Sequence, residues 1–300
     1  MRPIYLPIYL LTLILIFNGC GSRSSMQQSA EEARELRMMT YNIKYDNPDD
    51  SLNSWDQRRE KVTGLLQYHQ PDIIGTQEGL LHQLNDIKES IDRYDWLGKG
   101  RKDGSKEGEF SAILYDRTKL HAKSDTTLWL SPTPGQPSQG WDAAFPRIVT
   151  AARLVHKQSQ QQFLVFNTHF DHVGDTARKR SAELLHKFIG DFSQQGEAYI
   201  LMGDFNVTPG SKPYQILTEP ADSLNNSIPL RDSFHASELP HYGPAGTYTG
   251  FEVTQPGRRI DYIFCSPELT VKRHATLTDF NHMRFPSDHL PVVADIRIGM

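Results

Sequence analysis

The sequence predicts a layered α/β sandwich, in which two β-sheets pack face to face and helices cover their outer sides. Three observations lead to this fold class. Short apolar runs outnumber the segments with helical periodicity, the helical segments are inserted between those runs, and most runs are apolar throughout. A strand without polar alternation is typically covered on both faces, which two packed sheets achieve. The sequence shows no internal repeat and no linker, so we predict one domain over residues 36–300.

Helical periodicity marks three segments of the chain. In the first of them, Val62, Leu66 and His69 recur at the spacing of one helix face. Helices are predicted over residues 55–70, 79–92 and 174–190. Strands are predicted over residues 36–43, 71–78, 110–115, 124–130, 148–156, 162–169, 199–202, 259–265, 269–278 and 291–298. The stretch 205–258 is rich in Pro, Gly, Ser and Asn and is predicted to be irregular.

The composition is that of an ordinary globular protein. The chain has 300 residues, of which 38% are hydrophobic and 23% charged, and these fractions exclude an intrinsically disordered chain. The net charge is -4, whereas tight non-specific binding to nucleic acid usually requires a strongly basic domain. Catalysis on nucleic acid stays open, because a local basic groove can lie on an acidic protein.

The N-terminus has the pattern of an export signal. An apolar run that ends at Phe17 follows a single basic residue, and it is too short for a transmembrane helix but suits a signal peptide. A small residue followed by Cys20 resembles the bacterial lipoprotein cleavage box. We therefore predict a signal peptide over residues 1–19 and a lipid-anchored tether over residues 20–35. An ordinary cleaved signal and an uncleaved anchor are the alternatives.

The cysteine count agrees with a lipid anchor. Lipidation at Cys20 would hold the exported protein on a membrane of the bacterial cell envelope, facing the periplasm or the exterior. Cys265 is the only other cysteine, so the chain has no disulfide framework. It lies in the strand-like run "IDYIFCS" and is predicted to be a small buried side chain.

One short stretch, "YILMGDFNVTPG" at residues 199–210, raises the question of function. Its apolar run indicates a buried strand, which is followed by Asp204 and Asn206. Because strand side chains alternate, these two point the same way and Phe205 points the other way. A turn is the alternative, since Asp and Asn favour turns and a Pro-Gly pair follows closely.

Similar polar residues stand at the ends of five further apolar runs. Turns do not need Glu or His, so six strand edges that each carry an acid, an amide or an imidazole are hard to explain as turns. Buried acids are costly unless they are paired or bind a metal. A shared cluster around a cation and a phosphate accounts for the whole set. The further residues are Asn42, Glu78, His169, Asp171, Asp261, Asp288 and His289.

Taken in order, these residues and their neighbours resemble the endonuclease/exonuclease/phosphatase superfamily. The motifs are "TYNIKY", "TQE", "NTHFD", "GDFN", "RIDYIF" and "SDH", and the resemblance covers about residues 36–298. It implies a four-layer α/β sandwich, with two mixed β-sheets packed face to face and helices outside. It also implies Mg²⁺- or Mn²⁺-dependent cleavage of a phosphate ester. The local motifs are most similar to the nocturnin and deadenylase branch.

Three of these residues are predicted to hold the metal. Mg²⁺ prefers oxygen ligands and needs only one or two carboxylates besides the substrate phosphate. Glu78 and Asn42 match positions that the family uses as ligands, and Asp288 is the expected second acid near the metal. Lys44 stands where some family members carry an acid, which disfavours a second metal beside Asn42.

The other site residues are predicted to act on water and phosphate. Asp204 would orient or deprotonate the attacking water, and His289 can act as base while Asp261 holds its imidazole in one tautomer. Asn206 would donate its amide to a phosphoryl oxygen. His169 would contact the phosphate or protonate the leaving oxygen.

The substrate is the least determined part of the prediction. We favour a phosphodiester, and an exported enzyme would meet nucleic acid, nucleotides, sugar phosphates or lipid headgroups. A phosphomonoesterase or a sphingomyelinase-like phospholipase would use the same site, and a non-enzymatic surface binding module is a third possibility. The protein is predicted to be a monomer. The loop 98–109 indicates a solvated loop or a phosphate-binding flap, and Arg147, Asp171 and His172 receive no definite role.

Overall fold

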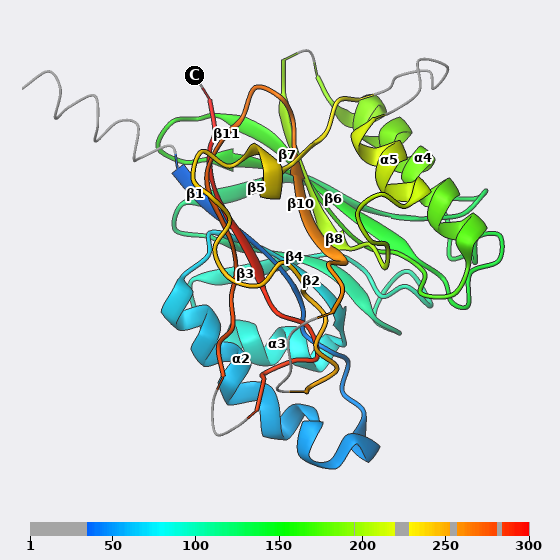
Figure 1. Cartoon of the computed structure of the whole chain (residues 1–300), viewed down its shortest axis with the longest axis vertical. Coiled ribbons are helices and arrows are strands. Elements are labelled where there is room, and N and C mark those ends of the chain that lie inside the picture. Colours follow the sequence, from blue (N-terminus) through cyan, green and yellow to red (C-terminus); the bar gives the residue numbers. More distant parts are fainter. Residues whose placement is uncertain (1–34, 195, 220–227, 253–256, 281–283, 300) are drawn as a thin grey trace, which may run out of the picture. The chain divides into compact units, whose positions relative to one another are not determined.

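Two mixed six-stranded β-sheets form the centre of the computed structural model, which describes residues 35–194, 196–219, 228–252, 257–280 and 284–299 (Figure 1). The first sheet has the order β11-β12-β1-β2-β4-β3 and the second β5-β6-β7-β8-β10-β9. In each sheet one neighbouring pair is parallel, β1 with β2 and β7 with β8, and the other pairs are antiparallel. The predicted pair of mixed sheets is confirmed.

The strands of the first sheet are β1 (Glu35–Asn42), β2 (Ile73–Gly79), β3 (Tyr94–Leu97), β4 (Phe110–Asp116), β11 (Thr270–Thr276) and β12 (Val292–Arg297). Those of the second are β5 (Leu120–Trp129), β6 (Ile148–His156), β7 (Gln162–His169), β8 (Ala198–Asp204), β9 (Arg231–Asp232) and β10 (Asp261–Cys265). The helices are η1 (Pro48–Asn53), α2 (Trp55–His69), α3 (Leu81–Ser90), α4 (Asp175–Phe192), α5 (Lys212–Thr218) and α6 (Ser233–Ala236).

The apolar residues of each central strand divide between two cores. In β1, Leu36 and Met38 lie in the core between the sheets, whereas Met39 and Tyr41 lie in the core beneath α2 and α3. Strand β8 divides in the same way between the inter-sheet core and the core beneath α4 and α5. Figure 1 shows these helix pairs on the two outer sides. Burial on both faces explains why the strands lack polar alternation, and it gives the four predicted layers.

The two sheets approach closely near the ends of β2 and β7. A Cβ atom added to Gly75 would lie 2.6 Å from the Oδ1 atom of Asn167 and from the sulfur of Met202, so a larger residue would force these side chains to shift. Asn167 also accepts a hydrogen bond from Gln77 Nε2 at 2.6 Å and donates one to the Thr76 carbonyl at 2.8 Å. This buried polar network sets the sheets in one relative position beside the site described below.

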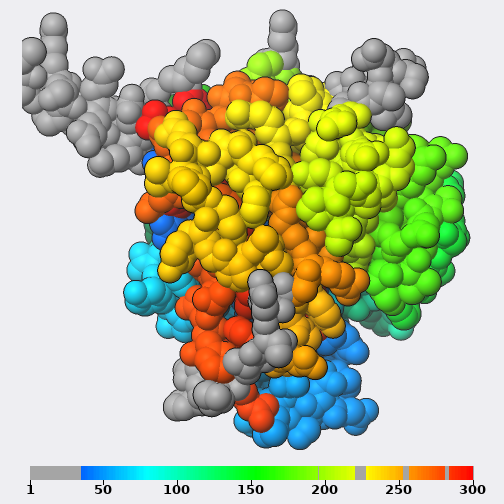
Figure 2. Space-filling view, in the orientation of Figure 1, coloured from blue at the N-terminus to red at the C-terminus, as the bar shows by residue number. Residues whose placement is uncertain are grey.

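The stretch 205–258 was predicted to be irregular, and this is wrong in part. It contains α5, β9 and α6, which are two to seven residues long, and such short elements carry too few residues to show periodicity. The same reason explains why β3 and η1 were not predicted. In Figure 2 the segment 228–252, yellow to gold, lies across the face of the molecule shown, so much of this stretch forms surface.

Several predictions concern the N-terminal residues. The signal peptide and nearly all of the tether lie outside the described residues, so export and lipidation at Cys20 stay predictions. Strand β1 begins at Glu35, one residue earlier than predicted. In the part of the chain that the structure describes, no helix has the length and apolar character to span a membrane. Cys265 is buried and free, as predicted.

Candidate active site

One pocket gathers the predicted site residues. Its volume is about 540 Å³, and it lies where β2, β7 and β8 end, beside the loop that precedes β12. Asn42 and Asp261 lie behind the pocket wall and hydrogen-bond to residues that line it. The other predicted residues line the pocket itself: Glu78, His169, Asp204, Asn206, Asp288 and His289. All eight are thus brought together, and both sheets contribute.

Strand register places three of these side chains in one row. Asp204, the last residue of β8, is opposite His169 of β7 on one side and opposite Asp261 of β10 on the other. Side chains opposite one another on neighbouring strands lie roughly 5 Å apart. The row therefore sets two acids and an imidazole side by side at the end of the second sheet.

The pair Asp204 and Asn206 is positioned by a turn that also points both into the pocket. Asn206 adopts a left-handed conformation with φ of 51°, and its backbone N–H donates to Asp204 Oδ1 at 2.9 Å. Phe205 points the opposite way and packs edge-on against Phe170 and Phe264. The predicted facing is confirmed, although the turn and not a continuing strand produces it.

His289 lies between two carboxylates. Its Nδ1 atom is 2.9 Å from Asp261 Oδ2, and its Nε2 atom is 3.7 Å from Asp204 Oδ2. Thr247 donates its hydroxyl to the same Asp261 oxygen at 2.5 Å, which fixes that carboxylate in place. The arrangement holds the imidazole in one orientation, with Nε2 toward the pocket.

The buried carboxylates change the protonation of this group. Burial opposes the charged form of His289, but the charges of Asp261 and Asp204 outweigh it and raise the His289 pKa well above its usual value. Burial, together with the Asp261 charge, raises the pKa of Asp204 to about 7. His289 is therefore a cation at neutral pH, and Asp204 is the group that changes charge there.

Two further carboxylates face each other across Lys44. The Lys44 ammonium lies 3.6 Å from Glu78 Oε2 and 3.4 Å from Asp288 Oδ2. Asn42 donates its amide to Glu78 Oε1 at 3.0 Å and to Asp204 Oδ2 at 3.1 Å, while its Oδ1 accepts from the Lys44 backbone. The Asn42 side chain thus joins the two groups of acids.

These residues fit a hard divalent cation. Glu78 and Asp288 present oxygens toward one positive charge, and carboxylate oxygens are the ligands that Mg²⁺ and Mn²⁺ prefer. Burial would raise the pKa of Glu78, but Lys44 and Asn42 outweigh it and lower that pKa, so the carboxylate is ionised and ready to bind a cation. By distance alone Asp204, Asp261 and His289 also form a possible metal group. The hydrogen bond at His289 Nδ1 makes that trio better suited to handling protons.

His169 lies on the side of Asp204 that faces away from Asp261. Asn206 Nδ2 donates to the Phe170 carbonyl and contacts His169 Nε2, each at 3.1 Å, so Nε2 accepts and the proton of the neutral ring is on Nδ1. Glu109 Oε2 is 4.0 Å from that Nδ1 atom. Burial, reinforced by nearby arginines, lowers the His169 pKa well below its usual value. His169 is therefore neutral at pH 7.

The three residues without a predicted role contact one another, with Arg147 and Asp171 buried and His172 exposed. Arg147 donates to Asp171 Oδ2 at 3.2 Å and contacts His172 Nδ1 at 2.9 Å. Burial opposes ionisation of Asp171, but three backbone N–H groups and Arg147 outweigh it and lower the Asp171 pKa to about 2. Asp171 holds Arg147, whereas Arg147 and His172 themselves line the pocket.

Other lining residues were not identified from the sequence, among them Arg101, Glu109, Tyr248 and Arg258. Arg101 pairs with Glu109 at 2.6 Å. Both belong to the loop 98–109, whose positive charge was the available signal, so this loop reaches the pocket. Nothing in the sequence around Tyr248 or Arg258 distinguishes them from ordinary loop residues.

A fully buried arginine connects the end of β1, which carries Asn42, with the loop before β12, which carries Asp288. Arg58 of α2 is 1% exposed and donates to the carbonyls of Ile43 at 2.6 Å, Lys44 at 3.0 Å and Pro286 at 3.0 Å. Its fourth hydrogen bond goes to the Asn53 carbonyl. The guanidinium thereby joins the end of β1 to the loop before β12.

Replacing this arginine is expected to destabilise the fold. Arg58→Met removes the side-chain donor to the Ile43, Asn53 and Pro286 carbonyls, whereas the Lys44 carbonyl keeps its hydrogen bond from Gln83 Nε2 at 2.9 Å. Buried unsatisfied groups cost enough that we expect a loss of at least about 3 kcal/mol in the free energy of unfolding. Urea denaturation measures this change. The matched control is Arg59→Met. Arg59 is exposed, and its ion pair with Asp86 is long, at 3.9 Å. Such surface pairs contribute little, so this substitution should change the free energy of unfolding by less than about 0.5 kcal/mol. Equal effects of the two substitutions would contradict the assignment.

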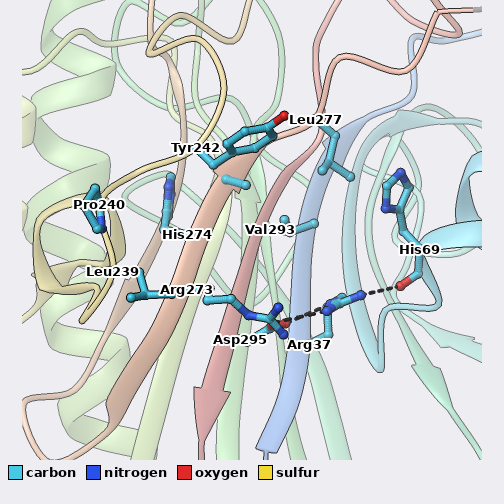
Figure 3. Close-up of a pocket in the computed structure, with 11 residues that line it drawn as sticks. Arg37, His69, Leu239, Pro240, Tyr242, Arg273, His274, Leu277, Val293 and Asp295 are labelled. Atoms are coloured by element: carbon cyan, nitrogen blue, oxygen red, sulfur yellow. Dashed lines mark hydrogen bonds and ion pairs between the residues drawn. The ribbon is translucent and has the colours of Figure 1, made fainter.

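A separate cavity, of about 300 Å³, lies between β11, β12, β1 and the end of α2, away from the candidate active site (Figure 3). None of the predicted site residues lines it. Its charged groups are paired with each other, since Arg37 donates to Asp295 Oδ1 at 2.8 Å and to the His69 carbonyl at 2.9 Å. It therefore offers no comparable set of groups for chemistry.

Comparison with known proteins decides the family. The model of the endonuclease/exonuclease/phosphatase family matches residues 39–289, which is most of the chain. The chain belongs to this family. Two curated relatives are uncharacterized proteins of Acanthamoeba polyphaga mimivirus, 34% identical over 163 residues and 25% identical over 269 residues. The matches cover 52% and 75% of this chain but only 60% and 37% of those relatives.

Solved structures of the family extend over nearly the whole described domain. A mannosyl-6-phosphatase of Bacteroides thetaiotaomicron is 38% identical, with a TM-score of 0.82, covering 87% of this chain and 99% of that one. A family member from Bacteroides vulgatus is 33% identical, with a TM-score of 0.82 and coverages of 88% and 99%. The human nocturnin catalytic domain is 21% identical, with a TM-score of 0.64 and coverages of 88% and 93%, which shows a shared fold.

Proposed function

We propose that this protein is a divalent-metal-dependent phosphoesterase that hydrolyses the phosphate monoester of a small sugar. The observation that carries the hydrolytic part is the pocket itself. It sets the carboxylates of Glu78 and Asp288, suited to a cation, beside Asp204 and His289, suited to proton transfer and phosphate binding. This combination is what attack of water on a phosphate ester requires.

The chain's own residues divide the work. Glu78 and Asp288 would hold the cation. Asn42 donates to both Glu78 and Asp204 and so holds the two carboxylates in a defined relative position. A bound divalent cation would neutralise charge on the phosphoryl oxygens and acidify water. Asp204 takes the proton of the attacking water, because its pKa of about 7 lets it exchange protons at physiological pH.

The imidazoles take different parts in this proposal. His289, held as a cation by Asp261, donates from Nε2 to a phosphoryl oxygen and stabilises the charge that develops there. The sequence suggested His289 as the base, whereas this proposal assigns that role to Asp204. Neutral His169 and Asn206 form the opposite wall. The Asn206 amide keeps its hydrogen bond to the Phe170 carbonyl and would turn its other N–H from His169 Nε2 to a phosphoryl oxygen.

The sugar monoester is favoured over the phosphodiester that the sequence suggested. The 38% identical structure is that of a mannosyl-6-phosphatase, and its similarity extends over 99% of that chain. Arg101 and Arg147 line the pocket and would donate charge-assisted hydrogen bonds to a terminal phosphate, and His172 lines it beside Arg147. A phosphodiester stays the second candidate, since the family fold is shared by enzymes of both kinds.

A substrate panel tests the proposal. The purified full-length protein with Mg²⁺ or Mn²⁺ is assayed on mannose 6-phosphate, bis(p-nitrophenyl) phosphate, RNA, DNA and sphingomyelin. We expect phosphate release from mannose 6-phosphate with a kcat/KM at least about tenfold above every diester, because enzymes of ordinary efficiency discriminate by this much or more. A diester that is turned over faster would establish the second candidate. Absence of turnover on every ester would support the binding-module alternative.

A further inference from the structure

A second pocket continues from the candidate active site. Its volume is about 500 Å³, and it lies between the first turns of α4 and α5. Arg178, Asn206, Arg258 and Ile260 line both pockets, so they form a shared wall. Because Asn206 belongs to the proposed phosphate-binding wall, a molecule whose phosphate contacts Asn206 has direct access to the second pocket.

The second pocket is basic. Lys179, Lys212 and Arg258 line it and are exposed, and no described carboxylate forms an ion pair with any of them. Arg178 pairs with Asp175, the pocket's one acid, and also donates to the Asp171 carbonyl at 2.9 Å. Four basic side chains thus face one carboxylate, on a chain whose net charge is -4.

Two other cations of α4, both outside the pocket, are paired with carboxylates of the same helix. Arg180 pairs with Glu183 at 2.9 Å, and Lys187 pairs with Asp191, each along the helix surface. These are the ordinary exposed pairs of a solvated helix. Lys179, on the same helix, lines the pocket and has no such partner among the described residues. Its charge is therefore available to a ligand.

A polar hydroxyl adds to the lining. Ser211 stands immediately before α5 and lines the pocket, and its buried Oγ atom has no hydrogen-bond partner within the described part of the chain. A hydroxyl and several ammonium and guanidinium donors together match the oxygens of a phosphate, which accepts several hydrogen bonds at once.

We propose that the second pocket binds a second phosphate of the same small substrate, so that the enzyme prefers sugar bisphosphates to sugar monophosphates. The proposal rests on the proposed function, because the first phosphate is the one hydrolysed in the active-site pocket. Charge-assisted hydrogen bonds from Lys179, Lys212 and Arg258 hold the second phosphate. A small molecule is favoured over nucleic acid, because the chain is acidic overall and the basic side chains that would hold the phosphate line one pocket of about 500 Å³.

The test uses a matched pair of substrates. Mannose 6-phosphate and mannose 1,6-bisphosphate differ only in the second phosphate, and kcat/KM is measured for both on the full-length protein. We expect the wild type to prefer the bisphosphate by at least about tenfold, which corresponds to one good charge-assisted contact. The double variant Lys179→Met/Lys212→Met should lose about tenfold of that preference, mainly through KM. The control Lys187→Met, paired with Asp191 outside the pocket, should keep the wild-type preference.

Each outcome decides between the proposals. Turnover of mannose 6-phosphate without a bisphosphate preference, or with a preference that the double variant keeps, would overturn the second site and leave the proposed function standing. No turnover of any phosphate ester would overturn the proposed function itself. If the double variant lowers cleavage of a single-stranded oligonucleotide but leaves the bisphosphate preference unchanged, the pocket serves a phosphodiester chain and the small-molecule proposal is overturned. Lys179 and Lys212 are exposed, so the double variant is expected to fold, and its urea midpoint is checked.

Discussion

Glu78→Gln, like removal of divalent cations with EDTA, is expected to lower phosphate release by at least about 10³-fold, since metal-ion catalysis supplies several kcal/mol of charge stabilisation. Glu78 is held for this role by strong constraints. It adopts a left-handed conformation with φ of 63°, unusual for a residue other than glycine, and its carboxylate accepts from Asn42 at 3.0 Å and from the Tyr45 backbone at 3.2 Å. The glutamine keeps the shape and removes the negative charge.

Metal binding gives a readout that does not depend on turnover. Titration with Mn²⁺, followed by calorimetry, should show binding to the wild type that is weakened at least about tenfold by Glu78→Gln, because a charged ligand is lost. Glu60→Gln is the control, since Glu60 is exposed on α2 and outside the pocket. Full activity after exhaustive EDTA treatment would refute metal dependence.

The second large effect is expected at Asp204. Asp204→Asn should reduce kcat by about 10² to 10⁴-fold, the range for loss of a general base. The substitution keeps an oxygen that can accept from the Asn206 backbone, so the turn is preserved while proton transfer is lost. Steady-state kinetics on the best ester of the panel measure the change, with Asp125→Asn on the exposed part of β5 as the control.

The pH profile separates a base from a merely structural acid. A base acts when ionised, and burial with the Asp261 charge raises the pKa of Asp204 to about 7, so kcat/KM should rise as pH increases through about 7. This rising limb should be absent from Asp204→Asn. The free energy of unfolding should change with pH in the opposite direction to kcat/KM. Because the pKa of Asp204 is higher in the folded state than in the unfolded chain, ionisation of Asp204 opposes folding. The contribution of Asp204 to stability therefore falls as pH rises from about 4, its pKa in the unfolded chain, toward 7. Above pH 7 the variant should be at least as stable as the wild type. A variant with normal turnover would make Asp204 a turn residue only.

Much of the fold was predictable because its signals are local. The apolar runs of β1 and β8 result from the burial of both faces of each strand, and the helical periodicity of residues 55–70 results from the burial of one face of α2. Elements such as α5 and β9 show no such sequence pattern, since seven and two residues are too few to show a period. Their positions depend on packing with distant parts of the chain.

The site divides in a similar way between sequence and tertiary structure. By itself the sequence determined which residue types stand at the strand ends, their order, the family they indicate and the metal-dependent chemistry that such acids, amides and imidazoles suit. Only the tertiary structure decided that Asp261 holds His289, that Asn42 joins Glu78 to Asp204, and that basic residues of two helices form a second pocket. The physical reason is that side-chain chemistry and burial periodicity are properties of neighbouring residues, whereas contacts between residues 28 to 162 positions apart follow from strand register and sheet packing.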